Sequence, residues 1–308
     1  MRVATIDLGS NTVRLLVADV EAARRSWRVV EADQRVTRLG EGLAASGRLG
    51  PVPAGRTAAA VREYVERARR AGAQRVAIVA TSAVREAANG RDFAVALERA
   101  TGEPVRIVSG DEEAELTLAG VLAGLDDASG AETLVFDIGG GSTEYILARG
   151  GEPLAAVSLR LGVVELAERY PFPGRVDWPR YDVLRAEVAR RLATELPARI
   201  RTAAPGRLVG TAGTATTLAA LDLGLTTYDP GRVQGHVLAR TAVERLRDRL
   251  GGLTVAERGA LPCLEPGRAD LIVAGVAIVQ ATLEITGTRA MVVSDWGLRE
   301  GILVGLGR

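Results

Sequence analysis

The sequence contains no lysine, one cysteine and one histidine among 308 residues, and each shortage excludes a class of chemistry. Without lysine there can be no P-loop kinase and no Schiff-base enzyme, because both need a side-chain amine. The single cysteine, Cys263, cannot form an intramolecular disulfide or a thiolate metal cluster, and this suits a reducing compartment. We therefore expect a cytoplasmic protein. The single histidine, His236, excludes metal phosphohydrolases that bind their ions through several histidines.

We expect neither an export signal nor a membrane span. Asp7 lies where a signal peptide would need its apolar core, and the longest apolar run, residues 271–279, has roughly half of the ~20 residues that cross a membrane. Thirty-nine Lys plus Arg against 38 Asp plus Glu give a formal net charge of +1. No overall field draws such a protein to nucleic acid or to an anionic membrane, and we expect neither as a partner.

The length and the hydrophobic pattern predict an α/β protein of two domains. A chain of this size, 47% hydrophobic and 25% charged, suits two domains of about 150 residues. Apolar runs rich in β-branched residues alternate with amphipathic helical stretches. Each half begins with three strands, and helices and strands then alternate. The turn-forming segment 126–130 marks a boundary, so the predicted domains are residues 1–125 and 126–308.

The beginnings of the two halves resemble each other. Residues 5–12 read TIDLGSNT and residues 135–143 read VFDIGGGST. In each, an apolar strand ends in aspartate, an apolar residue and glycine, and a hydroxyl-rich turn leads into the next strand. A similarity at a distance of about 130 residues is too long for a solenoid repeat and favours duplicated domains that face one another.

The two glycine-containing loops predict a site for phosphate and metal. Glycine lets successive backbone N–H groups converge on an anion. The residues predicted to bind phosphate are Gly9, Ser10 and Asn11 in the first loop and Gly139, Gly140, Gly141, Ser142 and Thr143 in the second. Asp7 and Asp137 precede these loops and can hold Mg²⁺ or another divalent cation together with phosphate oxygens. Either loop alone could be a plain hairpin turn, but a pair at the head of both halves favours phosphate binding.

Further motifs follow in a fixed order along the whole chain. They are ATSAVREA at residues 80–87, SGDEEA at 109–114, GTAGT at 210–214, RAD at 268–270 and GLREG at 297–301. Together with the two loops, they resemble the exopolyphosphatase and guanosine-pentaphosphate phosphohydrolase family, of the actin/hexokinase/Hsp70-like superfamily. The resemblance implies two actin-like (ribonuclease H-like) domains with a cleft between them, in the short two-domain form of the family. It also suggests a homodimer.

The resemblance assigns roles to further residues. It implies that Glu113 is the general base that activates water and that Glu144 binds metal or the nucleophilic water. Arg85 follows a strand that ends at Thr81 and Ser82, where it can hold phosphate oxygens and stabilise charge on the transferring group. The remaining residues of the predicted phosphate site are therefore Thr81, Ser82, Gly210 and Gly213.

Each of these assignments has a simpler alternative. Glu113 could only favour the dipole of its helix, Glu144 could be an exposed strand residue, and the 210–214 turn could be a plain helix cap. Arg85 could form a surface ion pair with Glu86 or Asp92. The arginine-rich stretches 62–70 and 185–201 could form a basic track for a long polyanion, although solvated helix faces are the more common case.

Gln234 departs from the family pattern, because family members often carry histidine at this place. Any role of that histidine is therefore in doubt for this chain. The leading hypothesis is an exopolyphosphatase that uses Mg²⁺ and releases orthophosphate from polyphosphate. Its close rival is hydrolysis of guanosine pentaphosphate, since both substrates end in a phosphoanhydride. Two other classes stay open: an actin-like ATPase or sugar kinase, and a non-catalytic protein that binds polyphosphate or an alarmone.

Overall fold

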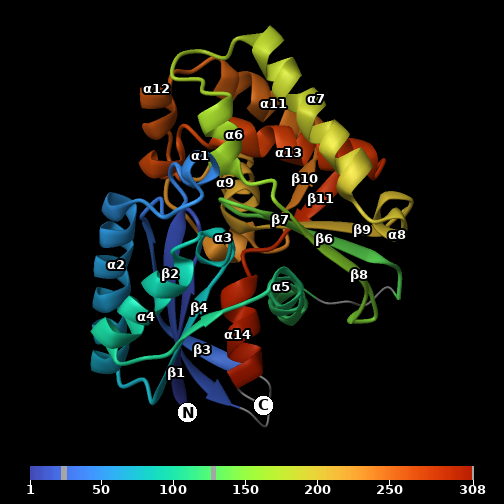
Figure 1. Cartoon of the computed structure of the whole chain (residues 1–308). Coiled ribbons are helices and arrows are strands. Elements are labelled where there is room, and N and C mark those ends of the chain that lie inside the picture. Colours follow the sequence, from blue (N-terminus) through green and yellow to red (C-terminus); the bar gives the residue numbers. More distant parts are fainter. Residues whose placement is uncertain (22–25, 126–129, 307–308) are drawn as a thin grey trace. The chain divides into compact units, whose positions relative to one another are not determined.

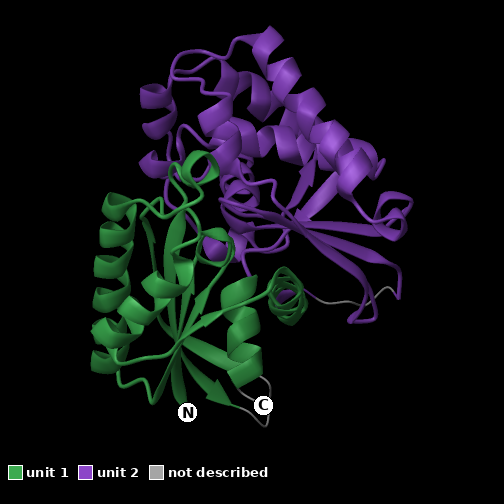
Figure 2. Ribbon diagram, viewed as in Figure 1, with its two compact units in different colours: residues 1–123, 297–308 green, residues 124–296 purple. Residues whose placement is uncertain are grey.

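The computed structural model describes residues 1–21, 26–125 and 130–306. The chain forms two compact units: unit 1 consists of residues 1–123 and 297–308, and unit 2 of residues 124–296 (Figure 2). The first passage between the units thus lies close to the predicted boundary at 125/126. The predicted assignment of the whole C-terminal part to the second domain is wrong from residue 297 onward, because that segment belongs to unit 1.

Unit 1 contains a five-stranded sheet with the strand order β3-β2-β1-β4-β5 (Figure 1). Strands β1, β2 and β3 are antiparallel neighbours, whereas β4 and β5 run parallel to β1. The strands are β1 (Arg2–Leu8), β2 (Thr12–Glu21), β3 (Ser26–Val36), β4 (Arg75–Ala80) and β5 (Val105–Ile107). This is the predicted pattern of three strands followed by alternating helices and strands.

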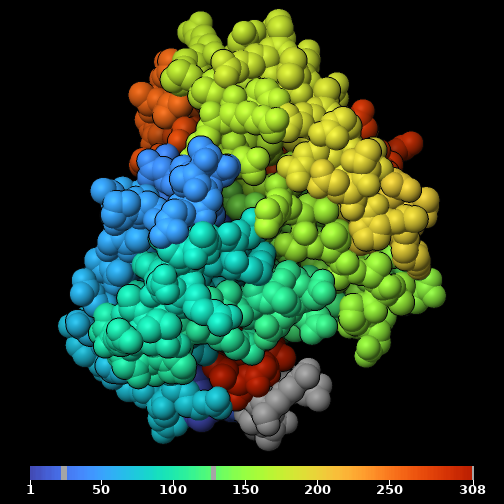
Figure 3. All heavy atoms as spheres, in the orientation of Figure 1, coloured from blue at the N-terminus to red at the C-terminus, as the bar shows by residue number. Residues whose placement is uncertain are grey.

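Helices cover both faces of this sheet. Helices α2 (Pro51–Arg70) and α4 (Gly90–Thr101) lie on one face, and α5 (Gly110–Gly124) and α14 (Leu298–Leu306) on the other (Figure 1). Figure 3 shows α2 and α4 at the surface, in blue to cyan. The short helices α1 (Leu43–Ser46) and α3 (Ser82–Glu86) lie in connections between longer elements.

The side chains of β1 alternate between the two faces. Ala4, Ile6 and Leu8 pack in the cluster that contains the apolar side chains of α2, and Val3 packs with Leu303 of α14 on the opposite face. Since successive side chains of a strand point to opposite faces, Asp7 lies on the α14 face. The C-terminal helix is therefore a neighbour of the first candidate loop.

Two glycines let the backbones of α5 and α14 approach closely. A Cβ atom on Gly120 would lie 1.9 Å from the carbonyl oxygen of Gly297, and one on Gly301 would lie 1.8 Å from that of Leu116. In this position α14 buries Leu303 against β1 and β2. Burial of apolar surface against the first sheet is the physical reason why the last helix belongs to unit 1.

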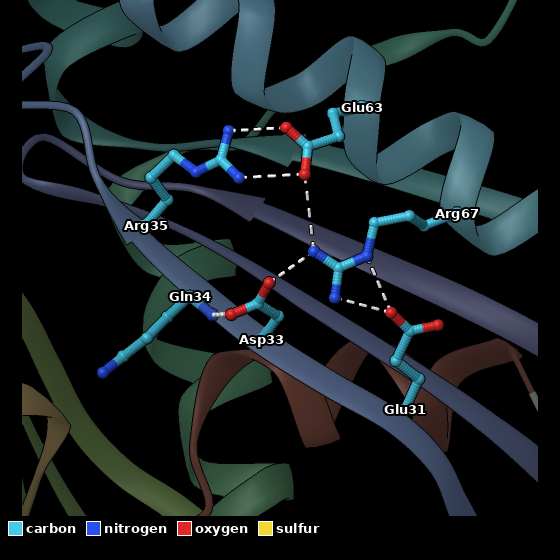
Figure 4. A network of polar contacts seen from close by, with 6 residues as sticks. All are labelled: Glu31, Asp33, Gln34, Arg35, Glu63 and Arg67. Carbon is cyan, nitrogen blue, oxygen red and sulfur yellow. Dashed lines mark hydrogen bonds and ion pairs between the residues drawn. The ribbon is translucent and has the colours of Figure 1, made fainter.

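An ion-pair network joins β3 to α2 (Figure 4). Arg35 donates to both carboxylate oxygens of Glu63, at 2.7 and 2.9 Å. Arg67 donates to Glu31 at 2.7 Å and to Asp33. All of these side chains are partly exposed, and exposed ion pairs contribute little to stability. The network orients α2 on the outer strand more than it stabilises the fold.

Unit 2 contains a six-stranded sheet with the order β10-β11-β9-β6-β7-β8. Strands β6, β7 and β8 are antiparallel neighbours, and β9 and β11 run parallel to β6. The strands are β6 (Thr133–Ile138), β7 (Thr143–Arg149), β8 (Glu152–Leu159), β9 (Arg207–Thr211), β10 (Val237–Ala239) and β11 (Ala290–Val293). The second sheet thus contains the strand order of the first, with β10 added antiparallel to β11, and the two mixed sheets with their helices confirm the predicted α/β fold class.

Helices α7 (Trp178–Glu195) and α13 (Ile272–Ile285) contribute apolar side chains to the same core cluster of unit 2 (Figure 1). The hydroxyl of Tyr145 on β7 lies 2.7 Å from Thr282 Oγ1 on α13, so a polar contact fixes the helix on the sheet. The helices are α6 (Val163–Arg169), α7 (Trp178–Glu195), α8 (Ala198–Arg201), α9 (Ala212–Asp222), α10 (Pro230–Val233), α11 (Arg240–Gly251), α12 (Val255–Gly259) and α13 (Ile272–Ile285), with a 3₁₀ turn, η2, at Pro266–Arg268.

One predicted helix of unit 2 is interrupted. The sequence favours a continuous helix over residues 179–201, but the structure ends α7 at Glu195 and begins α8 at Ala198. Leu196 adopts an extended conformation with ψ of 133°, as expected of a residue before proline, here Pro197. Of the helices in the described residues, none combines the length and the apolarity that a membrane span requires.

The close approach of α5 and α14 gives a first prediction. Gly301→Ala places a methyl group on the backbone of Leu116, so we expect it to lower the free energy of unfolding by about 1–3 kcal/mol or more. Gly55→Ala is the matched control, because a Cβ atom at Gly55 in α2 meets nothing within 4 Å and should stabilise the helix by about 0.5–1 kcal/mol. Denaturant unfolding measures both. Equal effects in the two variants would contradict the packing argument.

Candidate functional site

The predicted residues of unit 1 gather where its parallel strands end. β1 leads into the turn at Gly9, β4 leads into α3, and β5 leads into the first turn of α5. Backbone hydrogen bonds join the neighbouring ends: Thr81 N donates to Leu8 O at 3.2 Å, and Val108 N donates to Ala80 O at 3.1 Å. In open α/β sheets, ligands bind beyond the carboxyl ends of the strands, and this edge is such a place.

The first turn keeps its carbonyl oxygens inside unit 1. The turn is closed by a bond of 3.1 Å from Gly9 N to Thr12 O, and N–H groups of residues 37–40 donate to the carbonyl oxygens of Ser10 and Asn11 at 2.7–2.9 Å. In a trans peptide the N–H points opposite to the carbonyl of the preceding residue. The N–H groups of Asn11 and Thr12 therefore face away from segment 37–40.

The second turn has the same arrangement in unit 2. Gly139 N donates to Ser142 O at 2.9 Å, and the first N–H groups of α6 donate to the carbonyl oxygens of Gly139 and Gly140 at 3.1 and 2.9 Å. The N–H groups of Gly140 and Gly141 therefore point away from α6. Consecutive N–H groups that point the same way form an anion-binding concavity.

A glycine outside each turn makes this packing possible. A Cβ atom on Gly162, just before α6, would lie 2.2 Å from Gly140 O, and one on Gly40 would lie 3.2 Å from Ser10 Cβ. A side chain at Gly162 would collide with the second turn, and one at Gly40 would press on the first. Neither glycine was predicted from the sequence, since nothing local distinguishes it from an ordinary loop glycine.

Asp7 is a buried carboxylate surrounded by charge. It is 5% exposed, and its nearest cation is Arg14 on β2, with Nη1 3.7 Å from Oδ2. Burial raises the pKa of Asp7 above its ordinary value; the charges of Arg14 and Arg299 oppose this rise, and that of Glu300 adds to it. Sequence reasoning missed Arg14, Arg299 and Glu300 as neighbours of Asp7, although Arg14 follows the first loop and the other two lie in the GLREG motif.

Glu113 and Arg85 form a direct ion pair in unit 1. Arg85 Nη1 lies 2.7 Å from Glu113 Oε2 and also donates to Val108 O at 3.1 Å. Glu113 is 7% exposed, and the capping of α5 is done by Ser109, whose Oγ accepts from Glu112 N at 3.1 Å. The predicted base and the predicted phosphate ligand are thus brought together, and the alternative partners considered for Arg85 are not its partners here.

Polar residues on the strands of unit 2 form a row beside the second turn. In the strand register, Asp137 on β6 pairs with Glu144 on β7 and with Thr211 on β9, and Glu144 pairs with Ser158 on β8. Paired residues on neighbouring strands project from the same face of a sheet. Ser158 Oγ donates to Glu144 Oε1 at 2.7 Å, and Glu144 is 2% exposed, so the alternative of an exposed strand residue is excluded.

The GTAGT turn leads from β9 into α9. Ala212, the first residue of α9, has a φ of +65°, which is costly for a residue with a Cβ atom. A Cβ atom on Gly213 would lie 2.6 Å from Arg268 Nη1, so this arginine lies directly against the turn. The N-terminus of α9 and a guanidinium together suit an anion.

Some predicted phosphate ligands have bonds or contacts inside their own unit. Thr143 Oγ1 donates to Leu161 O at 2.5 Å, and Ser82 Oγ donates to Glu86 Oε1 at 3.2 Å. A Cβ atom on Gly210 would lie 2.9 Å from the ring of Phe136. Packing accounts for the glycine at position 210, and the first two hydroxyls already have partners, whereas Thr81 is the N-cap residue of α3 and lies next to the first turn.

The donor set fits a cation that keeps water and phosphate ligands. Among residues 1–21, 26–125 and 130–306, no group of three or more His, Cys, Asp or Glu side chains surrounds a metal position. Asn11 Oδ1 is buried without a hydrogen-bond partner in that part of the chain and lies in the turn that follows Asp7. Mg²⁺ is commonly bound by one or two carboxylates together with water and substrate phosphates, so the residues are compatible with it.

Several arginines of the two arginine-rich stretches form ion pairs with acidic residues. On α2, Arg67 and Arg69 pair with acidic residues. In the second stretch, Arg185, Arg191 and Arg199 pair with Glu284, Glu195 and Glu132. Arginines that are already paired do not need a polyanion to balance their charge. This geometry favours the interpretation as helix faces over that of a basic track.

The chain is similar in sequence to known proteins over nearly its whole length. Residues 16–307 match the Ppx/GppA phosphatase family. Exopolyphosphatase 2 of Mycobacterium tuberculosis is 37% identical to the chain over 99% of its length and 98% of the relative. Exopolyphosphatase 1 of Mycobacterium bovis is 30% identical and covers 99% and 88% of the two chains.

Solved structures of similar proteins have the same fold as this chain. The crystal structure of the Aquifex aeolicus member of the Ppx/GppA protein family superposes with a TM-score of 0.82 at 32% identity, covering 99% of this chain and 97% of the other. An exopolyphosphatase from Cytophaga hutchinsonii superposes with a TM-score of 0.91 at 25% identity, covering 100% and 98%. The similarity in sequence and in fold therefore extends over nearly the whole chain.

The left-handed residue of the GTAGT turn gives a prediction. Ala212→Gly relieves a conformation that costs about 1–2 kcal/mol with a Cβ atom, and we expect a gain of about 0.5–1 kcal/mol in the free energy of unfolding after the entropic cost of glycine. Ala193→Gly, at an exposed position of α7, is the control and should lose about 1 kcal/mol. If both variants were destabilised alike, Ala212 would not be strained.

Proposed function

This chain belongs to the Ppx/GppA phosphatase family, and from this premise we propose that it is an exopolyphosphatase, which hydrolyses the terminal phosphoanhydride of inorganic polyphosphate and releases orthophosphate. The observation that carries the proposal is the pair of turns whose N–H groups point away from segment 37–40 and from α6, one turn beside Asp7 and one beside Asp137. A chain of phosphates offers each turn the anion that it suits. The relatives named exopolyphosphatase favour polyphosphate over guanosine pentaphosphate.

We propose Glu113 as the general base. Its carboxylate would accept a proton from the attacking water as the water approaches the terminal phosphorus in line with the leaving oxygen. Both bonds of Arg85 to Glu113 and Val108 use Nη1, so Nη2 and Nε remain for phosphate oxygens. The guanidinium would then orient the base and stabilise negative charge on the transferring phosphoryl group.

Mg²⁺ is the cofactor that we propose, with another divalent cation as a substitute. Asp7 in unit 1 and Asp137 and Glu144 in unit 2 are the carboxylates that would hold it, and Asn11 Oδ1 offers a further oxygen. The ion supplies charge neutralisation of the phosphate oxygens. Polyphosphate carries many negative charges, and the single net positive charge of the protein does not offset them.

Three further expectations belong to this proposal. We expect the phosphate ligands to be Gly9, Ser10 and Asn11 with Gly139, Gly140, Gly141, Ser142 and Thr143, supported by Thr81, Ser82, Gly210 and Gly213. The enzyme is a homodimer, which light scattering of the purified protein tests. It acts in the cytoplasm, which fractionation of cells tests. We expect nucleic acid and membranes to play no part in the reaction.

Phosphate release from defined substrates tests the function. We expect the purified protein with Mg²⁺ to release orthophosphate from long-chain polyphosphate faster than from guanosine pentaphosphate or ATP, each in a separate reaction. Chelation of the metal should abolish release, because the carboxylates near the turns would then repel the substrate. Turnover of ATP alone would favour an actin-like ATPase, and fastest turnover of guanosine pentaphosphate would reassign the substrate.

Glu113→Gln tests the mechanism. Glutamine keeps the size and one acceptor oxygen for Arg85 but cannot take a proton, so we expect turnover to fall by about 10²–10⁴ while polyphosphate binding stays close to that of the wild type. Glu112→Gln is the matched control: Glu112 lies in the same turn and pairs with Arg106 at 2.9 Å. It should retain full turnover. Undiminished turnover in Glu113→Gln would mean that another group activates the water.

A further inference from the structure

The chain passes between its two units at two places, between residues 123 and 124 and between residues 296 and 297. We name these places the first link and the second link. Any change in the arrangement of the units has to be accommodated by backbone torsions at or near the links. Contacts that fix the links on the side of unit 2 therefore restrict how the arrangement of the units can change.

One side chain binds both links. Gln234 Nε2 donates to Gly124 O at 2.9 Å, and Gln234 Oε1 accepts from Asp295 N at 2.6 Å. Glutamine suits this task because its amide carries a donor and an acceptor at adjacent atoms. A Cβ atom on Gly124 would lie 2.7 Å from Gln234 Nε2 and 2.6 Å from the ring of Trp296, so only glycine allows this contact.

The base of Gln234 is fixed within unit 2. Gln234 is the C-cap of α10, and its own N–H donates to Pro230 O at 2.9 Å. The next residue, Gly235, has a φ of +78° and donates to Val293 O at 2.8 Å. The side chain thus starts from backbone that is attached to the end of β11. Because the backbone of Gln234 is already fixed, binding both links through the side-chain amide costs little further conformational entropy.

The second link continues into the candidate site on both sides. Trp296 O accepts from Thr211 Oγ1 at 3.1 Å and from Ser294 Oγ at 2.7 Å, and Thr211 belongs to the GTAGT turn of unit 2. The following residue, Gly297, donates its N–H to Glu300 Oε2 at 2.9 Å in unit 1. Glu300 is one of the charges that act on Asp7.

We propose that Gln234 is a positioning residue for the reaction: it joins the two links into one unit-2 anchor, so that the turns beside Asp7 and Asp137 engage the same polyphosphate chain in one register. This assignment rests on the proposed exopolyphosphatase function for its effect on turnover. The joining of the links does not depend on that function. The two side-chain hydrogen bonds of Gln234 are both to the backbone of the links, so its effect on turnover is transmitted through the backbone.

Hydrogen exchange in the full chain tests whether the links are joined. Gln234→Met has a similar length and removes both bonds, and we expect amide exchange to become about tenfold faster in peptides covering residues 120–125 and 294–298. Gln280→Met is the matched control: Gln280 is another half-buried glutamine of unit 2, and it accepts from Tyr181 at 2.7 Å. It should leave both peptides unchanged.

Gln234→Glu separates the two bonds. At neutral pH its carboxylate can still accept from Asp295 N, but it presents an oxygen instead of a donor to Gly124 O. We expect faster exchange over residues 120–125 and wild-type exchange over residues 294–298. Unchanged exchange at both links in Gln234→Met, or equal effects of Gln234→Met and Gln280→Met, would overturn the proposal.

Kinetics with polyphosphate tests the positioning role. We expect kcat/KM to fall about tenfold in Gln234→Met, with a melting temperature lowered no further than in Gln280→Met. Faster exchange at both links combined with unchanged kcat/KM would overturn the positioning role. If the wild type does not hydrolyse polyphosphate, the exopolyphosphatase function fails, and the exchange experiment still decides whether Gln234 joins the links.

Discussion

The arrangement of the candidate site depends on where the carbonyl oxygens of two short turns find their hydrogen bonds. In both turns, N–H groups of the same unit bind these oxygens, at segment 37–40 in unit 1 and at the start of α6 in unit 2. Planar trans peptides then direct the following N–H groups the other way. Consecutive N–H groups thus point the same way without the help of a charged side chain, and Gly162 is needed because backbone has to pack on backbone.

The two turns share their backbone but differ in their charges. Asp7 faces Arg14 across the strand pair and is influenced by Arg299 and Glu300 from α14. Asp137 instead belongs to a row of oxygen-bearing side chains that includes Glu144. The same turn geometry therefore lies in two different electrostatic environments. In unit 1, Asp7 lies near arginines; in unit 2, Asp137 and Glu144 are paired in the strand register.

Local features of the sequence were sufficient to predict the strands and turns, but they were not sufficient to predict contacts between residues far apart in the chain. Asp-x-Gly after an apolar strand predicted both turns, because the turn and its glycine are adjacent in the chain. The pairing of Arg85 with Glu113 was not predicted, since the acidic residues near Arg85 in sequence were the natural candidates, and α3, which carries Arg85, is too short for a periodic pattern. A helix of five residues is too short for apolar residues to recur on one face, so the sequence does not indicate which way its side chains point.

The assignment of α14 illustrates the same limit and explains the first half of the site. Nothing in residues 297–301 indicates which sheet the last helix joins; the choice depends on the fit of Gly301 against Leu116 and on the burial of Leu303. Arg299 belongs to this helix, and its charge opposes the rise in the pKa of Asp7 that burial causes. Cations close to a buried carboxylate favour its charged form over its neutral form. The return of the C-terminal helix to unit 1 therefore determines the charges that act on Asp7 as well as the packing of the first sheet.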